Sequence, residues 1–161
     1  MCAVALLLFA WTGADAQENI SAPTGTKLVL ETVADGAQVY TCTAEKQAFA
    51  WVFKQPEAAL FNQQGRQIGT HFAGPSWRLD DGGTVVGEVA ARADAPDHTS
   101  IPWLLLRAKS HEGKGLLSAV TFIRRAETKG GAAPRSGCDA SHAGESARMR
   151  YSALYQFFAP G

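Results

Sequence analysis

The chain has 161 residues, which is enough for one domain and short for two. Its 15 Lys and Arg residues balance 15 Asp and Glu residues, so it lacks the concentrated basic charge typical of nucleic-acid-binding proteins. A hydrophobic fraction of 46% excludes a wholly disordered chain. The 16 glycines and 7 prolines favour many short strands over long helices.

The N-terminus carries an apolar run from Ala3 to Trp11, followed by Ala14-Asp15-Ala16. A run of this length is typical of a signal peptide and too short to span a bilayer. We therefore expect residues 1–16 to be a signal peptide that is cleaved before Gln17. The mature protein would then be secreted or periplasmic, without a transmembrane segment. The alternative for the apolar run is a buried N-terminal strand.

Cleavage would remove Cys2 and leave two cysteines, Cys42 and Cys138. In an oxidising compartment, two remaining cysteines favour a single disulfide. The alternative is a pair of free or metal-binding thiols, although the sequence contains no Cys-x-x-Cys motif.

The mature chain divides into a loose lead-in over residues 17–26 and a single β domain over residues 27–161. In the domain, short alternating segments separated by turn signals predict about nine or ten strands. The expected strands are residues 27–33, 38–44, 49–53, 57–61 (or one helical turn), 67–72, 76–79, 84–91, 103–106, 116–124 and 148–158. No segment has the pattern of an amphipathic helix. The expected fold is therefore an all-β, antiparallel β-barrel or β-sandwich.

Three local signals mark boundaries between the expected strands. Asp35-Gly36 predicts a turn, Pro56 predicts an interruption, and Asp81-Gly82 predicts a hairpin turn. Within the last strand, alternation places Tyr151 and Tyr155 on one face.

The densest group of polar and aromatic side chains lies between residues 69 and 83. His71 could act there as a general base or a ligand, oriented by Asp80 or Asp81. Trp77 could stack on a flat ligand. The alternative is structural, with Trp77 in the core, a surface or hydrogen-bonded His71, and the two aspartates forming a turn. We take His71, Trp77, Asp80 and Asp81 as the candidate ligand-binding residues.

The sequence gives little support for a metal site, a serine nucleophile or a nucleotide-binding site. The four histidines are isolated, so we expect no metal site. No Gly-x-Ser-x-Gly elbow, phosphate-binding loop or dinucleotide fingerprint is present, and we expect no cofactor. Trp51 and Trp103 lie in strand-like segments, and we expect both in the core.

Short segments throughout the chain resemble those of a known family. They are Val39-Tyr40-Thr41-Cys42, Trp51 with Pro56-Glu57-Ala58-Ala59-Leu60, residues 69–77, Asp81-Gly82 with Val86-Gly87, residues 101–106, Thr128 with residues 130–134, Cys138, and residues 151–155. On these segments the chain resembles, from about residue 28 to 158, the secreted proteins of bacteria and fungi grouped as domain-of-unknown-function family 3455. The resemblance implies the fold, export and paired Cys42 and Cys138, but no particular activity. Arg78 and Gly83 replace an acidic residue and a serine of the family pattern, so a site using that acidic residue would be altered here.

The leading hypothesis is a non-enzymatic, exported β domain that binds a small ligand or an envelope component. The alternative is a secreted hydrolase that uses His71 with Asp80 or Glu88, and a third hypothesis is a structural envelope protein without a small-molecule site. His71 hydrogen-bonded to a carboxylate at a pocket mouth would favour the enzyme. Trp77 exposed on a cavity wall without such a pair would favour binding, and a filled interior would favour a structural role.

Overall fold

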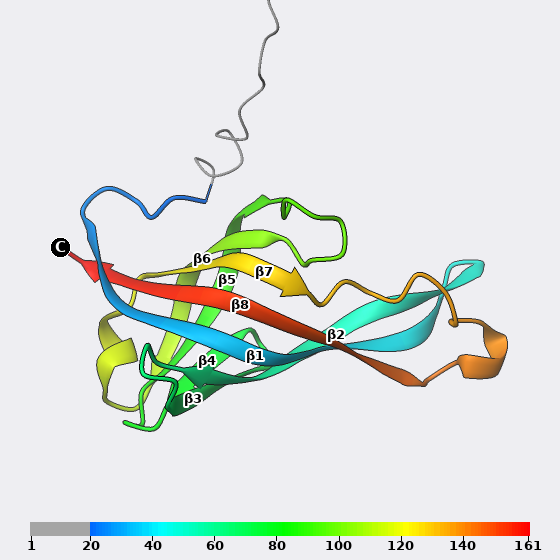
Figure 1. Cartoon of the computed structure of the whole chain (residues 1–161), viewed down its shortest axis with the longest axis horizontal. Coiled ribbons are helices and arrows are strands. Elements are labelled where there is room, and N and C mark those ends of the chain that lie inside the picture. The colour runs from blue at the N-terminus through cyan, green and yellow to red at the C-terminus, as the bar shows by residue number, and fades with distance from the viewer. Residues whose placement is uncertain (1–19) are drawn as a thin grey trace, which may run out of the picture.

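The computed structural model of the chain describes residues 20–161, so the expected signal peptide lies outside the described residues. The elements are β1 (Thr26–Glu45), β2 (Ala48–Phe61), β3 (Gln67–Phe72), β4 (Ser76–Leu79), β5 (Thr84–Ala93), β6 (Trp103–Glu112), the 3-10 helix η1 (Leu116–Ala119), β7 (Phe122–Gly130), the 3-10 helix η2 (Ala140–His142) and β8 (Ser146–Pro160). Neighbouring strands pair antiparallel in chain order, and β8 pairs with β1 to close the sheet into a barrel (Figure 1). The all-β antiparallel fold is confirmed.

Within residues 20–161 there are eight strands rather than nine or ten, because two expected boundaries lie inside continuous strands. The turn predicted at Asp35-Gly36 is wrong: β1 continues through both residues, pairing Gly36 with Ala58 on one side and Tyr151 on the other. A Cβ atom on Gly36 would lie 2.1 Å from the carbonyl oxygen of Glu57. The glycine therefore permits close approach of two strands and does not form a turn.

The interruption predicted at Pro56 is also wrong, since β2 runs through it. β3 pairs with β2 only from Ala58 to Phe61, so Pro56 lies on a part of β2 that no strand covers on that edge. Proline lacks a backbone N–H and is tolerated at an unpaired strand edge, where no ladder hydrogen bond is lost.

The strand predicted over residues 116–124 begins later than expected, because its first part is the 3-10 helix η1. Leu117, inside the helix, and Val120, which follows it in extended conformation and donates its N–H to the carbonyl oxygen of Leu117, are both fully buried. Asp81 fixes the start of the helix, since its Oδ2 atom accepts a hydrogen bond of 2.7 Å from the backbone N–H of Leu116. β7 follows from Phe122.

The barrel interior holds the larger of two hydrophobic clusters. Its largest members are Trp77, Tyr151, Tyr155, Phe157, Leu60, Leu106 and Ile123. The smaller cluster combines Ile20, which precedes β1, with Ala93 and Leu105 and with the partly buried Trp103 and Phe122. Leu105 alternates with Leu104 and Leu106, so β6 is covered on both faces, as its apolar sequence predicts.

β1, β2 and β8 extend beyond the other strands as a twisted ribbon, with the segment around η2 beside its end (Figure 1). Cys42 of β1 and Cys138 form a disulfide, as expected. The backbone of Cys42 also exchanges hydrogen bonds with the end of the η2 loop, donating to Glu145 and accepting from Gly144, both at 2.8 Å. The long segment between β7 and β8 is thereby attached to the ribbon.

Replacing the bridge in the double variant Cys42→Ala/Cys138→Ala should lower the free energy of unfolding. The bridge spans 96 residues of sequence, and the loop-closure entropy that it removes from the unfolded chain corresponds to at most about 4–5 kcal/mol. Urea denaturation of the oxidised protein and the variant measures the difference. Equal transition midpoints would contradict the prediction.

Candidate functional site

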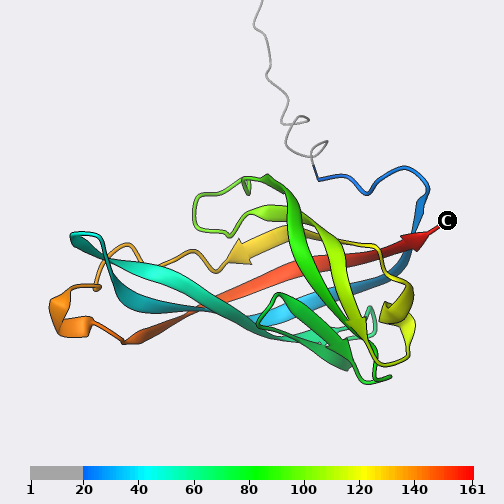
Figure 2. The ribbon, with the colours of Figure 1, turned by 180° about the vertical axis from the view of Figure 1, so that it is seen from behind.

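A cavity opens between β2 and β5, where the barrel lacks pairing. β3 pairs with β2 only from Ala58 to Phe61, and β4 pairs with β5 only from Thr84 to Val86. Beyond the short β3–β4 hairpin, β2 and β5 diverge, with β7 and β8 visible between them from behind (Figure 2). The cavity there has a volume of about 560 Å³. It is lined by Gln38, Tyr40, Phe53, Lys54, Pro56, His71, Gly74, Pro75, Trp77, Val89, Arg92, Ile101, Pro102, Leu104, Leu106, Arg125 and Tyr155.

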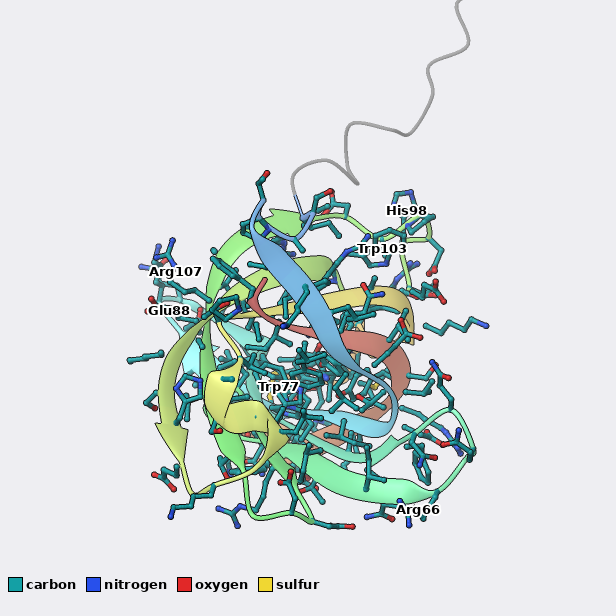
Figure 3. The ribbon with its side chains drawn as sticks, turned by 90° about the vertical axis from the view of Figure 1, so that its left-hand side faces the viewer. Arg66, Trp77, Glu88, His98, Trp103 and Arg107 are labelled. Atoms are coloured by element: carbon teal, nitrogen blue, oxygen red, sulfur yellow. A yellow bond between two sulfur atoms is a disulfide. The ribbon has the colours of Figure 1, made fainter. Side chains whose placement is uncertain are left out.

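Three rings form the inner wall of this cavity. His71 and Trp77 are directly opposite each other in the β3–β4 ladder, and their rings stack with centroids 4.5 Å apart and planes 10° from parallel. Tyr155 of β8 packs edge-on against both, at 5.0 Å from His71 and 5.4 Å from Trp77. Trp77 lies at the centre of the ring of strands (Figure 3) and is only 1% exposed. It is thus a core residue that also contributes to the cavity wall.

His71 is neutral at physiological pH. Its Nδ1 atom donates a hydrogen bond of 2.9 Å to the carbonyl oxygen of Ser76, so Nε2 carries no proton and is an acceptor. Burial lowers the pKa of His71 to about 3; the Ser76 hydrogen bond opposes this effect, and the positive charge of Arg125 makes a smaller contribution in the lowering direction. An imidazole with such a low pKa is a weak general base near pH 7.

The two candidate aspartates lie elsewhere. Asp80 and Asp81 line a separate hollow beside Arg66 and are absent from the cavity wall. Asp81 acts as a turn former, since its Oδ1 atom accepts from the backbone N–H of Gly83 at 2.9 Å while Oδ2 holds Leu116. The structure therefore brings together His71 and Trp77 but not Asp80 and Asp81.

Glu88, the other carboxylate considered for His71, lies on the outside of the barrel. It pairs with Arg107 across the β5–β6 ladder, and both side chains are seen at the periphery in Figure 3. The cavity wall contains neither Asp nor Glu. Arg78 also faces outwards: its Nε atom donates to Thr84 at 3.2 Å, and its guanidinium lies 5.3 Å from the centroid of the Phe72 ring.

Gln38, Arg125 and Tyr155 line the cavity but are absent from the sequence-based hypothesis. Arg125 of β7 donates from Nε and Nη2 to the carbonyl oxygen of Pro102, at 3.0 and 2.7 Å. Burial raises the pKa of Tyr155, and the nearby positive charge of Arg125 opposes that effect. Gln38 Nε2 and Tyr155 Oη are buried and make no hydrogen bond of regular geometry; the same is true of Trp77 Nε1.

The alternation of inward-facing and outward-facing residues along a strand, with its period of two, could have identified Gln38 and Tyr155 as cavity residues. Gln38 precedes Tyr40 and Cys42 at that spacing, so it shares their inward face, and a polar residue among inward apolar ones is unusual. Tyr155 belongs to the inward face already predicted for the last strand. Arg125 was hidden because the strand expected over residues 116–124 ended one residue before it.

The remaining aromatic and metal-binding candidates have structural positions. The core position expected for Trp51 is wrong, because Trp51 is partly exposed, belongs to neither hydrophobic cluster and donates from Nε1 to the carbonyl oxygen of Ser136 at 2.9 Å. Trp103 is partly buried and packs against the smaller hydrophobic cluster. Over residues 20–161, no three His, Cys, Asp or Glu side chains converge as a metal site would require. That same part of the chain contains no helix with the length and apolar character needed to cross a membrane.

The burial of neutral His71 should make stability depend on pH. Its pKa is about 3 in the folded state against 6.5 for a free side chain, so between these values the unfolded state binds one more proton. The contribution of neutral His71 to the free energy of unfolding is complete above pH 6.5. It is lost as the pH falls towards 3, by up to about 1.4 kcal/mol per pH unit. The free energy of unfolding of His71→Phe should therefore fall less steeply from pH 6.5 to 4 than that of the wild type. Parallel slopes in denaturant titrations would contradict this.

Comparison with known proteins places the chain in one family. The family model described as "Protein of unknown function (DUF3455)" matches residues 23–159. No curated protein and no solved structure gives a significant match. The family match begins just before β1 and ends in β8, so it includes every strand of the barrel and every residue of the cavity wall. The chain belongs to the DUF3455 family.

Proposed function

We propose that this protein is exported and binds a small molecule with an apolar body in the cavity between β2 and β5. Ligand cavities in proteins commonly measure about 300–1,000 Å³ and combine apolar walls with a few polar groups. The cavity of about 560 Å³ fits this description. Leu104, Leu106 and Ile101 supply apolar surface, and aromatic rings form its inner wall.

One observation carries the proposal: Trp77 lines the cavity, and its buried Nε1–H donor has no hydrogen-bond partner. Gln38 and Tyr155 also line the cavity, and their buried polar atoms meet Tyr151 and, for Tyr155, Arg125 only in a geometry short of a regular hydrogen bond. A buried polar group left without a partner costs about 1–3 kcal/mol. One unpartnered indole N–H and two polar groups without a regular hydrogen bond at the same cavity destabilise a purely structural barrel. A ligand with acceptor atoms would offset this cost when it binds.

The geometry gives the hydrolase hypothesis no comparable support. A general base needs a suitable pKa and, commonly, a carboxylate that orients it. His71 instead donates to a backbone carbonyl, and the wall around it contains no carboxylate. The geometry therefore supports binding better than catalysis.

Export is supported by the pairing of Cys42 and Cys138, since disulfides persist in oxidising compartments. The expected signal peptide over residues 1–16 points the same way. The ligand would then be encountered in the periplasm, in the envelope or outside the cell.

Binding should be detectable with the neutral, flat, fluorescent probe N-phenyl-1-naphthylamine, whose emission rises in apolar surroundings. We expect saturable binding of one equivalent to the wild type. Val89 lines the cavity and is 57% exposed, so an indole at this position would fill the mouth. Affinity for the probe should fall about tenfold or more in Val89→Trp.

Val33→Trp is the matched control, because Val33 is 48% exposed and does not line this cavity. This variant should bind the probe like the wild type. Absence of saturable binding to the wild type, or equal affinities in all three proteins, would overturn the proposal.

A further inference from the structure

The charged side chains of the cavity wall all have the same sign. They are Lys54, Arg92 and Arg125, and no Asp or Glu lines the cavity. The ion pairs among residues 20–161 join His142 to Asp139, Arg148 to Glu57 and Arg150 to Asp35, so none of them uses a cation of the cavity. Glu57 lies near Lys54, and Asp94 and Asp97 line an adjoining hollow that Arg92 shares, so Arg125 is the cation of the wall without a nearby carboxylate among the cavity residues.

Lys54 and Arg92 differ from Arg125 in position. Lys54 and Arg92 are exposed and belong to the strands that flank the mouth, whereas Arg125 is partly buried and belongs to β7, behind the mouth. Burial raises the pKa values of Tyr40 and Tyr155 and lowers that of His71, and the positive charge of Arg125 acts on all three groups in the lowering direction. These effects place Arg125 near the inner wall.

Donors outnumber acceptors around Arg125. Trp77 contributes an unpartnered indole N–H, and Gln38 and Tyr155 contribute an amide N–H and a hydroxyl that lack a regular hydrogen bond. Arg125 spends its Nε and one terminal nitrogen on the carbonyl oxygen of Pro102, and its planar fork has further N–H donors. A carboxylate accepts hydrogen bonds only, carries the opposite charge and matches the guanidinium geometry. It is therefore the head group that this set of donors best recognises.

The outer part of the cavity is suited to an apolar body. Phe53 of β2 and Val89 of β5 line it and are 50% and 57% exposed. Large exposed apolar side chains at the rim of a cavity whose inner wall carries polar groups are typical of a ligand site. Leu104 and Leu106 continue this apolar surface inwards.

We infer that the ligand is an amphipathic organic acid whose carboxylate binds at Arg125 and whose apolar body extends towards Phe53 and Val89. This inference rests on the proposed function and adds the chemical class of the ligand and its orientation. One charge-assisted hydrogen bond to the carboxylate would change the affinity by about tenfold or more.

The test compares decanoate with 1-decanol, which have the same chain length and differ in the charged head. Each ligand is titrated against the protein loaded with N-phenyl-1-naphthylamine, and displacement gives its affinity. The wild type should bind decanoate about tenfold more tightly than decanol. In Arg125→Gln this preference should fall towards equality, while the affinity for decanol and for the neutral probe is retained. Arg125→Lys keeps the charge without the fork and should retain part of the preference.

Arg124→Gln is the matched control. Arg124 precedes Arg125 in β7, does not line the cavity, and donates to Gln156 from the opposite face at 3.2 Å. The preference for decanoate should survive in this variant. 2-Naphthoate and 2-naphthalenemethanol repeat the comparison with a flat body, and a preference for the acid in either pair supports the inference.

Equal affinities of acid and alcohol in the wild type for both pairs would overturn the inference while leaving the proposed function intact. A preference lost in Arg92→Gln but kept in Arg125→Gln would also overturn it, because the carboxylate would then sit at the mouth. Failure of the neutral probe and of all four ligands to bind would instead overturn the proposed function itself.

Discussion

The unequal length of neighbouring strands is the constraint from which the rest of the structure follows. β3 and β4 have 6 and 4 residues, yet they lie between β2 with 14 and β5 with 10. A closed ring of backbone hydrogen bonds can form only where all strands are present. The barrel is therefore complete at one end and lacks two strands at the other. The cavity occupies the place where those strands stop.

The polar side chains of the cavity lie on strands that are fixed by pairing in the complete part of the barrel. Stacked His71 and Trp77 belong to the short hairpin, and Tyr155 belongs to a strand that is paired on both sides. Their positions are thus fixed by backbone ladders rather than by loops. The proposed binding site would therefore be preformed, and little binding free energy would be lost in ordering it.

Local patterns in the sequence predict the all-β class, most strand positions and the disulfide, because alternation and turn residues act over a few positions. The errors at Asp35-Gly36 and Pro56 have a common cause. At Gly36 a neighbouring strand lies so close that only glycine fits, and at Pro56 no strand pairs with the free edge of β2. Both features depend on strands distant in sequence, which a local pattern cannot indicate. The grouping of His71 with Asp80 fails for the same reason. Sequence proximity does not place two side chains on one face, and Arg125, about a third of the chain away from His71, is its actual electrostatic neighbour.

The two strand edges beside the cavity also bear on association between copies of the chain. Unpaired edges expose backbone donors and acceptors that can recruit a strand from another molecule. Here the edge of β2 carries Pro56 and Lys54, and β5 is interrupted by register shifts between Val86 and Gly87 and between Val89 and Ala91. Proline, charge and bulges are features by which proteins resist edge-to-edge aggregation. Lys54 and Arg92 at the mouth would thus keep the opening accessible to a small molecule while repelling a second barrel.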